Sequence, residues 1–345
     1  MPQPTIISNR RQFMKTMAAG GLAAAASPLT GLAAHQGNKR VKLGYDNFAV
    51  RAMNWMVEDH LEYSEKLGID SLFMSDLDHF KSFDKKYLVD VRKKASDKGI
   101  DIHVGTWSIC PTSVTFKDDW GNAEEHLRLA IRVAENLGSP VIRVVLGNRD
   151  DRQTEGGIMA RIEDTAKVCR ACRSQALDAG IKIAVENHAG DMQAGEVVTL
   201  IEEAGGSEYM AANLDAGNAS WTLEDPLENL EIMGPYAATT SLRDSAIWVS
   251  ENGTTVQWTA MGKGHVDWVA YFKRFKEICP GVPVHIETIS GFNREIPFLD
   301  DGFMDMFQDM KATTLARYLK WARQGKARDP WKAPVGPNAD RADHN

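Results

Sequence analysis

The sequence predicts an α/β protein whose single domain is a (β/α)8 barrel of the TIM type. Short apolar runs alternate with amphipathic segments eight times between residues 41 and 323, and strands that alternate with helices form a parallel sheet. Acidic residues end three of these runs, and all strands of a parallel barrel point their carboxyl ends at one face. An open doubly wound sheet is the alternative fold, but no GxGxxG follows the first run.

The expected elements follow one another in a regular order. Strands are predicted at residues 41–45, 71–74, 102–106, 141–146, 181–186, 210–215, 237–243 and 282–287. Helices are predicted at residues 52–67, 82–98, 123–137, 157–179, 196–204, 226–233, 266–278 and 304–323. In the third helix the apolar residues recur along one face, and Gly138 follows as a stop signal.

Composition indicates one large soluble domain with an acidic surface. The chain has 345 residues, of which 43% are hydrophobic and 25% are charged. The net charge is −7, and removal of a leader with three basic residues and no acids takes it to −10, which disfavours a nucleic-acid partner. Cys169 and Cys172 form a CxxC, but they fall on the apolar face of a predicted helix. We therefore expect core packing rather than redox or zinc chemistry.

The two ends of the chain are predicted to lie outside the barrel of residues 40–325. Arg10 and Arg11 precede an Ala- and Gly-rich run, so residues 1–36 resemble a twin-arginine signal peptide, with cleavage near Ala33 or Ala34. A membrane anchor is the alternative, but this run is only weakly apolar. The resemblance implies a periplasmic protein without a stable membrane anchor. The Lys-, Pro- and Asp-rich tail, residues 326–345, is expected to wrap the surface or stay disordered.

Three acidic residues stand where predicted strands end. Glu186 closes the fifth strand, Asp215 the sixth and Glu287 the eighth, so they are expected to meet at the mouth of the barrel. Carboxylates gathered together repel one another, and a divalent cation relieves that repulsion. Oxygen ligands favour Mn²⁺ or Mg²⁺ over Zn²⁺ or Co²⁺. The alternative is that arginines such as Arg143 or Arg243 pair with the acids individually.

The order of these motifs resembles the xylose isomerase-like barrel superfamily. The segments that carry the resemblance are Glu-Asn-His-Ala-Gly at 186–190, Leu-Asp-Ala-Gly-Asn at 214–218, Ser-Leu-Arg-Asp-Ser at 241–245, Met-Gly-Lys-Gly at 261–264 and Ile-Glu-Thr at 286–288. That superfamily includes sugar isomerases and epimerases, inosose dehydratase-like enzymes and metal-dependent abasic-site endonucleases. The resemblance implies that Glu186, Asp215 and Glu287 are metal ligands.

The chain departs from the superfamily pattern at two positions. Asn218 and Ser241 stand where many members have histidines, so the resemblance does not extend to a trinuclear zinc site or to DNA repair. The fourth metal ligand stays open between Gln257, ranked first, and His188, and Ser241 could act through a water.

The predicted chemistry is proton abstraction next to a carbonyl. Glu186 and Glu287 come from nonadjacent strands, so they are the candidate acid and base on either side of a substrate. The expected substrate-binding residues are His188, Arg243, His103, Trp107 and Asn218. For Arg243 an ion pair with Asp215 or Asp244 is the alternative. His285 is expected to pack in the core with one hydrogen bond.

Together these features predict a divalent-metal-dependent sugar isomerase or epimerase that acts on a small carbohydrate. One alternative is a lyase that performs β-elimination on 3-keto-glycosides, and another is a non-catalytic sugar-binding barrel. Without an evident Lys/Arg cluster or phosphate cradle at the mouth, sugar phosphates are disfavoured. Arg149 and Arg152 lie in a charged loop that is expected to be solvated. Oligomer formation is left open.

Overall fold

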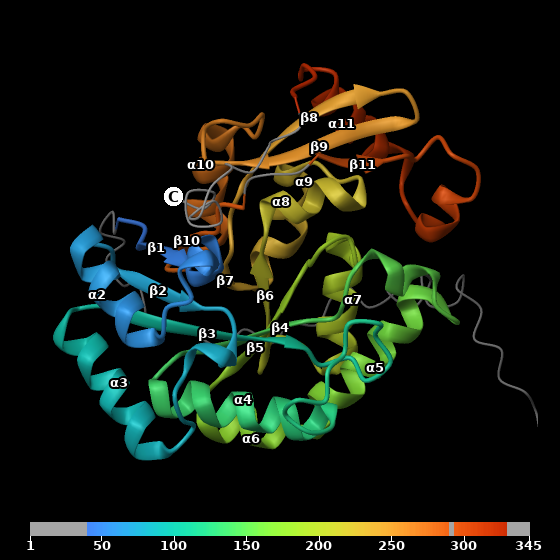
Figure 1. Ribbon diagram of the computed structural model, residues 1–345. Helices are drawn as coiled ribbons and strands as arrows, with labels where there is room; N and C mark the ends of the chain where they lie inside the picture. Colours follow the sequence, from blue (N-terminus) through green and yellow to red (C-terminus); the bar gives the residue numbers. More distant parts are fainter. Residues whose placement is uncertain (1–39, 290–292, 330–345) are drawn as a thin grey trace, which may run out of the picture. The chain divides into compact units, whose positions relative to one another are not determined.

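The computed structural model describes residues 40–289 and 293–329 (Figure 1). The predicted signal peptide and most of the predicted tail lie outside the described residues. Residues from Arg40 onward form one compact unit. In the described part of the chain, no helix is both long enough and apolar enough to cross a membrane.

Eight parallel strands form the barrel, as the sequence predicts. They are β1 (Leu43–Asp46), β2 (Ser71–Met74), β3 (Asp101–Ser108), β4 (Val141–Val145), β5 (Lys182–Glu186), β6 (Met210–Leu214), β7 (Ala237–Thr240) and β10 (Val284–Ile286). Their order is β10-β1-β2-β3-β4-β5-β6-β7. Leu242 closes the ring, because its N–H donates to the carbonyl of His285 at 2.8 Å and its carbonyl accepts from Glu287 at 2.8 Å.

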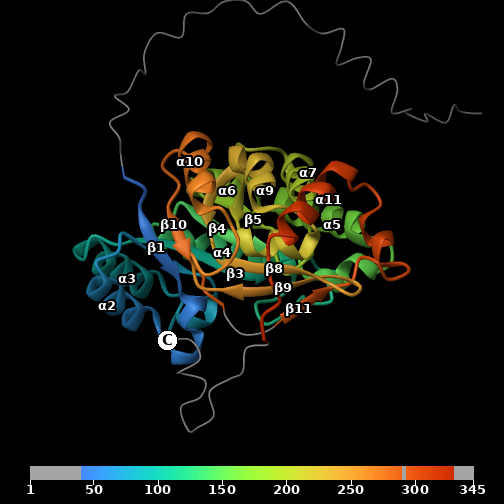
Figure 2. The same cartoon turned by 90° about the horizontal axis from the view of Figure 1, so that it is seen from above.

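Helices surround the strands (Figure 2). They are α2 (Val57–Leu67), α3 (Lys85–Asp97), α4 (Ala123–Leu137), α5 (Gly157–Ala171), α6 (Arg173–Ala179), α7 (Ala194–Ala204), α8 (Ala216–Ala219), α9 (Pro226–Met233), α10 (Trp268–Ile278) and α11 (Ala312–Ala322). Helix α4 illustrates how the sequence sets the start, the buried face and the end of a helix. Asn122 caps its first turn, its apolar face is buried, and Gly138 ends it with φ of 73°.

Several predicted elements differ from the structure. The helix expected over 52–67 begins only at Val57, after a 3-10 helix at Asn47–Met53. The helix expected over 304–323 is a 3-10 helix at Phe303–Phe307 followed by α11. The helix expected over 157–179 is two helices that meet at Cys172, whose φ of −100° and ψ of 1° interrupt the helical backbone. The strand expected over 237–243 ends at Thr240, because the chain leaves β7 to enter a second sheet. The four cysteines are free and buried, which agrees with core packing.

The second sheet is absent from the sequence-based prediction. Antiparallel strands β8 (Asp244–Ser250), β9 (Gly253–Thr259) and β11 (Asn293–Ile296) form it in the order β11-β9-β8. It starts four residues after β7 and packs with α11, so it lies at the carboxyl end of the barrel (Figure 1). A separate apolar cluster that includes Trp221, Trp258 and Tyr318 joins it to the loops there.

Candidate metal and carboxylate centre

The structure brings Glu186, Asp215 and Glu287 together inside the mouth of the barrel. One carboxylate oxygen from each residue lies within 4.8 Å of the others. The residues are 2%, 0% and 6% exposed. They meet because each stands at or just after the carboxyl end of a parallel strand, β5, β6 or β10.

Local hydrogen bonds orient Asp215. The residue caps α8, and its Oδ1 accepts from the backbone N–H groups of Gly217 at 2.7 Å and Asn218 at 3.1 Å. Asn187 donates to the Asp215 carbonyl at 2.9 Å and accepts from the Asp215 N–H at 3.1 Å. These bonds tie the end of β5 to the end of β6, so Asn187 is a positioning residue that the sequence did not single out.

Two buried arginines contact the three acids. Arg143, from the middle of β4, places Nε 3.2 Å from Glu186 Oε2, and it donates to the carbonyls of Thr106 and Ser75. Arg243 donates to Glu287 at 2.6 Å and also to Asp215. The clustered carboxylates and the arginine pairs, which the sequence offered as alternatives, therefore occur together.

Asp244 does not compete for Arg243. Its carboxylate accepts the backbone N–H groups of Gly262 and Gly264, both at 2.9 Å, and the indole N–H of Trp268 at 2.8 Å. Asp244 thus holds the Met-Gly-Lys-Gly turn. Arg243 is left to pair with the acids at the centre of the barrel.

A fourth buried acid, Asp46, lies at the end of β1. Its Oδ2 accepts from Ser241 Oγ at 3.0 Å, and Ser241 in turn accepts from Asn213 at 3.3 Å. Ser241 is therefore engaged with Asp46. Asp46 adds a fourth carboxylate to the surroundings of Glu186 and Glu287, so the acids here outnumber the two guanidinium groups.

Burial controls the protonation of these acids. Burial raises the pKa of Glu186 to about 7, although the charge of Arg143 opposes the shift. Burial also raises the pKa of Asp215 and raises that of Glu287 well above its ordinary value, with Arg243 opposing both shifts. The centre favours bound protons or an added cation because the buried charges are incompletely balanced.

The residues fit a divalent cation. Three carboxylate oxygens converge, the acids outnumber the guanidinium groups, and among the described residues the buried Oδ1 of Asn218 has no hydrogen-bond partner. Asn218 Nδ2 donates to Glu186 at 3.2 Å and to Asp215 at 2.6 Å. An all-oxygen donor set suits Mg²⁺ or Mn²⁺. Because Arg243 pairs with Asp215 and Glu287, a cation held by the three acids would compete with this arginine for two carboxylates.

Gln257 is not placed as a fourth ligand, which corrects the first-ranked expectation. Its Nε2 donates to Asn293 Oδ1 at 2.8 Å and to the Asp329 carbonyl at 3.0 Å. The next residue of β9, Trp258, faces the Arg243 guanidinium at 4.3 Å. Since consecutive strand residues point to opposite faces, Gln257 points away from the carboxylates.

His188 lies at the mouth beside the two arginines. Its Nδ1 is 2.7 Å from the Gly147 carbonyl, so Nδ1 carries the proton and Nε2 keeps a lone pair. Burial, with the charges of Arg143 and Arg243, lowers the pKa of His188 to about 4. Its ring meets the edge of Trp107 at 5.3 Å, and the Trp107 indole N–H donates to the Thr115 carbonyl.

His103 is placed away from this centre, which corrects its expected role in substrate binding. Its Nδ1 lies 3.0 Å from Thr239 Oγ1, and its ring is 4.9 Å from that of His285. It lines a hollow with Lys42 and Pro140, which precede β1 and β4, so it belongs to the amino-terminal end of the barrel. His285 packs there as expected, but with more than the one hydrogen-bond contact expected: Nε2 lies 2.8 Å from Ser71 Oγ and Nδ1 lies 3.1 Å from the Thr240 carbonyl.

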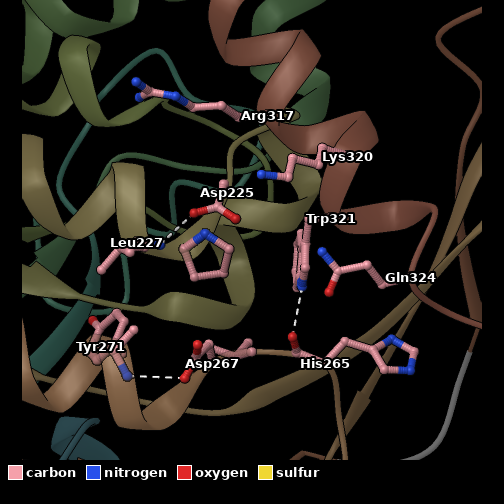
Figure 3. Close-up of a pocket in the computed structure, with 12 residues that line it drawn as sticks. Asp225, Leu227, His265, Asp267, Tyr271, Arg317, Lys320, Trp321 and Gln324 are labelled. Atoms are coloured by element: carbon pink, nitrogen blue, oxygen red, sulfur yellow. Dashed lines mark hydrogen bonds between the residues drawn. The ribbon is translucent and has the colours of Figure 1, made fainter.

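A cavity of about 350 Å³ lies between α9, α10 and α11 (Figure 3). Asp225 and Asp267, at the starts of α9 and α10, line it together with Arg317 and Lys320 of α11. None of the three carboxylates lines it. It is therefore separate from the centre described above.

Comparisons with known proteins agree with the fold. The family model of the xylose isomerase-like TIM barrel matches residues 61–301. No curated protein matches the chain.

Among solved structures, a xylose isomerase domain protein from Planctomyces limnophilus is 18% identical, with a TM-score of 0.54 over 75% of this chain and 92% of that one. An IolI protein with a bound zinc atom is 14% identical, with a TM-score of 0.55 over 83% and 100%. A D-psicose 3-epimerase in the presence of D-fructose is 15% identical, with a TM-score of 0.56 over 81% and 96%. At these identities the solved structures establish the fold alone. With the family model matching most of its length, the chain belongs to the xylose isomerase-like TIM barrel family.

Proposed function

We propose that this protein is a sugar isomerase or epimerase that moves a proton at a carbon next to a carbonyl group. The observation that carries the proposal is the convergence of Glu186 and Glu287, from nonadjacent strands, on one buried centre. The family supports it, as do fold neighbours named as D-psicose 3-epimerase and L-ribulose 3-epimerase.

The chain supplies an acid and base pair for this reaction. Glu186 accepts the proton from carbon, and Glu287 delivers one on the other side of the substrate. Asp215 is fixed by Asn187 and the first turn of α8, so it serves as an anchor. Neutral His188 offers Nε2 to a substrate hydroxyl.

A divalent cation, Mn²⁺ or Mg²⁺, would be held by Glu186, Asp215 and Glu287. When bound, it supplies Lewis-acid polarisation of substrate oxygens. Arg243, released from two of these carboxylates, then has N–H groups available for the same oxygens of the sugar.

The test follows solvent deuterium into carbon-bound positions of D-psicose, D-fructose and 3-keto-glycosides, with purified protein supplied with Mn²⁺. We expect exchange by the parent protein and a loss of about 100-fold or more in Glu186→Gln and Glu287→Gln. Glu231→Gln, at an exposed ion pair with Arg274, is the matched control and keeps the parent rate.

The products separate the alternatives. Exchange with an intact sugar skeleton supports the isomerase or epimerase, whereas release of an aglycone from a 3-keto-glycoside identifies a lyase. Tight sugar binding without exchange, with or without Mn²⁺, identifies a non-catalytic binding protein and refutes the proposal.

A further inference from the structure

Two arginines far apart in the sequence meet at the mouth of the barrel. Arg149 begins the 3-10 helix of residues 149–153 after β4, and Arg294 lies in β11. The backbone N–H of Arg149 donates to the Ala189 carbonyl at 3.2 Å, which fixes its loop against the end of β5. The two guanidinium groups are close enough that Arg294, after burial, is the main cause of the lowered pKa of Arg149, about 10.

Gly190 permits this approach. Its φ is 85°, and a Cβ built on it would lie 3.3 Å from Arg149 Cβ and 3.6 Å from Trp221 Cβ. The side chain of Arg149 therefore runs beside Trp221. Arg294 lies over the same indole, with its guanidinium carbon 4.9 Å from the ring centroid.

Neither arginine forms an ion pair with an acidic residue in the described part of the chain. Within residues 40–289 and 293–329, no ion pair involves Arg149 or Arg294, whereas the two arginines at the carboxylate centre both have one. Among the described residues, no hydrogen-bond partner is found for buried nitrogens of both side chains, namely Nε and one Nη of Arg149 and Nε of Arg294. Unpaired buried donors and unbalanced like charges are costly, and they call for an external partner.

Aromatic rings orient the two groups without using their donors. Arg149 lies over Phe303 at 5.8 Å and Arg294 over Trp221 at 4.9 Å. A ring contacts the flat face of a guanidinium, so the N–H groups in its plane stay available for an oxyanion. Both side chains are partly exposed, so a ligand can reach them.

A stacked series of groups links this pair to the carboxylate centre. Trp221 stacks on Trp258 at 4.2 Å with 7° between the planes, and Arg243 lies over Trp258 at 4.3 Å. Two indole layers therefore separate Arg294 from Arg243. A group bound by the arginine pair would belong to an outer part of the ligand and not to the reacting carbon.

We propose that Arg149 and Arg294 form an oxyanion-binding site that takes the carboxylate or phosphate group of a sugar ligand. The assignment rests on the proposed function for the presence of a sugar in the barrel. It revises the sequence-based expectation that this loop is merely solvated and that the mouth lacks an arginine cluster.

The test is a binding measurement, which does not depend on turnover. Dissociation constants are measured by calorimetry for D-glucose, D-glucuronate, D-glucose 6-phosphate, inorganic phosphate and acetate, at low and high salt. We expect at least one anionic sugar to bind about tenfold or more tightly than D-glucose, and salt to reduce this preference.

Variants assign the preference to the arginine pair. The double variant Arg149→Gln with Arg294→Gln is expected to lose the preference for the anionic sugar while it still binds D-glucose. The double lysine variant keeps part of the preference, because the charge remains but the planar donors do not. Arg274→Gln on α10 is the control and keeps the full preference.

Each outcome decides the question. The proposal is overturned if anionic and neutral sugars bind equally, if the glutamine double variant retains the preference, or if phosphate and acetate bind at the pair while anionic sugars gain nothing. A protein that shows the preference without deuterium exchange retains the oxyanion site but refutes the isomerase proposal. Deuterium exchange without a preference for anionic sugars supports the isomerase proposal and refutes the oxyanion site.

Discussion

Arg243 is the side chain on which the state of the carboxylate centre depends. It is 2% exposed, donates to both Asp215 and Glu287, and stacks on Trp258. The resemblance leads us to expect a histidine at position 241, where the chain has a serine. Here Ser241 is bonded to Asp46, and a positive side chain two residues later contacts the acids.

At the residue scale, we predict that Arg243→Ala binds Mn²⁺ more tightly than the parent protein. The cation no longer competes with a guanidinium for two carboxylates, and its repulsion from that charge disappears. We expect a gain of about tenfold or more, equivalent to about 1.4 kcal/mol, in a calorimetric titration. Arg274→Ala is the control, and an unchanged or weaker affinity in Arg243→Ala would mean that no such competition exists.

The first residue of α7, Ala194, is hydrogen-bonded to a buried acid, Glu224, from another part of the chain. Glu224, 3% exposed, accepts the N–H of Ala194 on both carboxylate oxygens at 3.0 Å, and it also accepts from Thr222 and Asn229. A carboxylate at a helix N-terminus is favourable, but burial outweighs these bonds and raises the pKa of Glu224 to about 8 from 4.5.

At the element scale, this shift predicts a pH-dependent stability. In the folded protein Glu224 keeps its proton up to about pH 8, whereas the unfolded chain releases it near the ordinary pKa of 4.5. The contribution of Glu224 to the free energy of unfolding is therefore complete below pH 4.5. It is lost as the pH rises to about 8, by up to about 1.4 kcal/mol per pH unit. Urea unfolding should show that Glu224→Gln, which cannot titrate, gains stability relative to the parent across this range.

The matched comparison is Glu231→Gln. The hydrogen bond from Arg274 lowers the pKa of Glu231 below its ordinary value of 4.5. The contribution of Glu231 to the free energy of unfolding therefore changes only below pH 4.5 and stays constant from pH 5 to 8. If the difference between parent and Glu224→Gln is also flat over that range, Glu224 is ionised throughout and the predicted proton is absent.

For the whole molecule, the barrel and its second sheet form one unit from Arg40 onward. Residues 1–36, which resemble a twin-arginine leader, lie outside the described residues. We propose that this leader directs the protein to the periplasm, and that the folded unit does not need it.

At the scale of the molecule, we predict that changing Arg10→Lys and Arg11→Lys together leaves the protein in the cytoplasm of a bacterial host that has the twin-arginine route. Removal of residues 1–36 should leave the melting temperature unchanged to within about 2 °C, less than the shift that about 1 kcal/mol produces. Cell fractionation and calorimetry measure the two effects. Export of the double lysine variant at the parent level would contradict the assignment of the leader.

Some features that the sequence analysis missed or misplaced could have been recognised from the sequence, and others could not. Asp46 ends a strand just as Glu186 does, so it could have been recognised from its place, as Arg143 was in the apolar run of the fourth strand. The second sheet gave less warning, because β8 and β11 are separated by more than forty residues and pair only through β9. Gln257 was assigned by nearness along the chain to a turn, and the alternation of β9 turns it away.

By itself, the order of short apolar runs, amphipathic segments and acids at run ends determined the barrel, its eight strands and the meeting of Glu186, Asp215 and Glu287. These features follow from local periodicity and from the common direction of parallel strands. Only the tertiary structure decided that Arg243 contacts two of the acids and that Arg149 meets Arg294 beside Trp221. Such pairings depend on side-chain positions in loops and in a second sheet. There, residues distant in sequence come together, and no repeating pattern in the sequence predicts their contact.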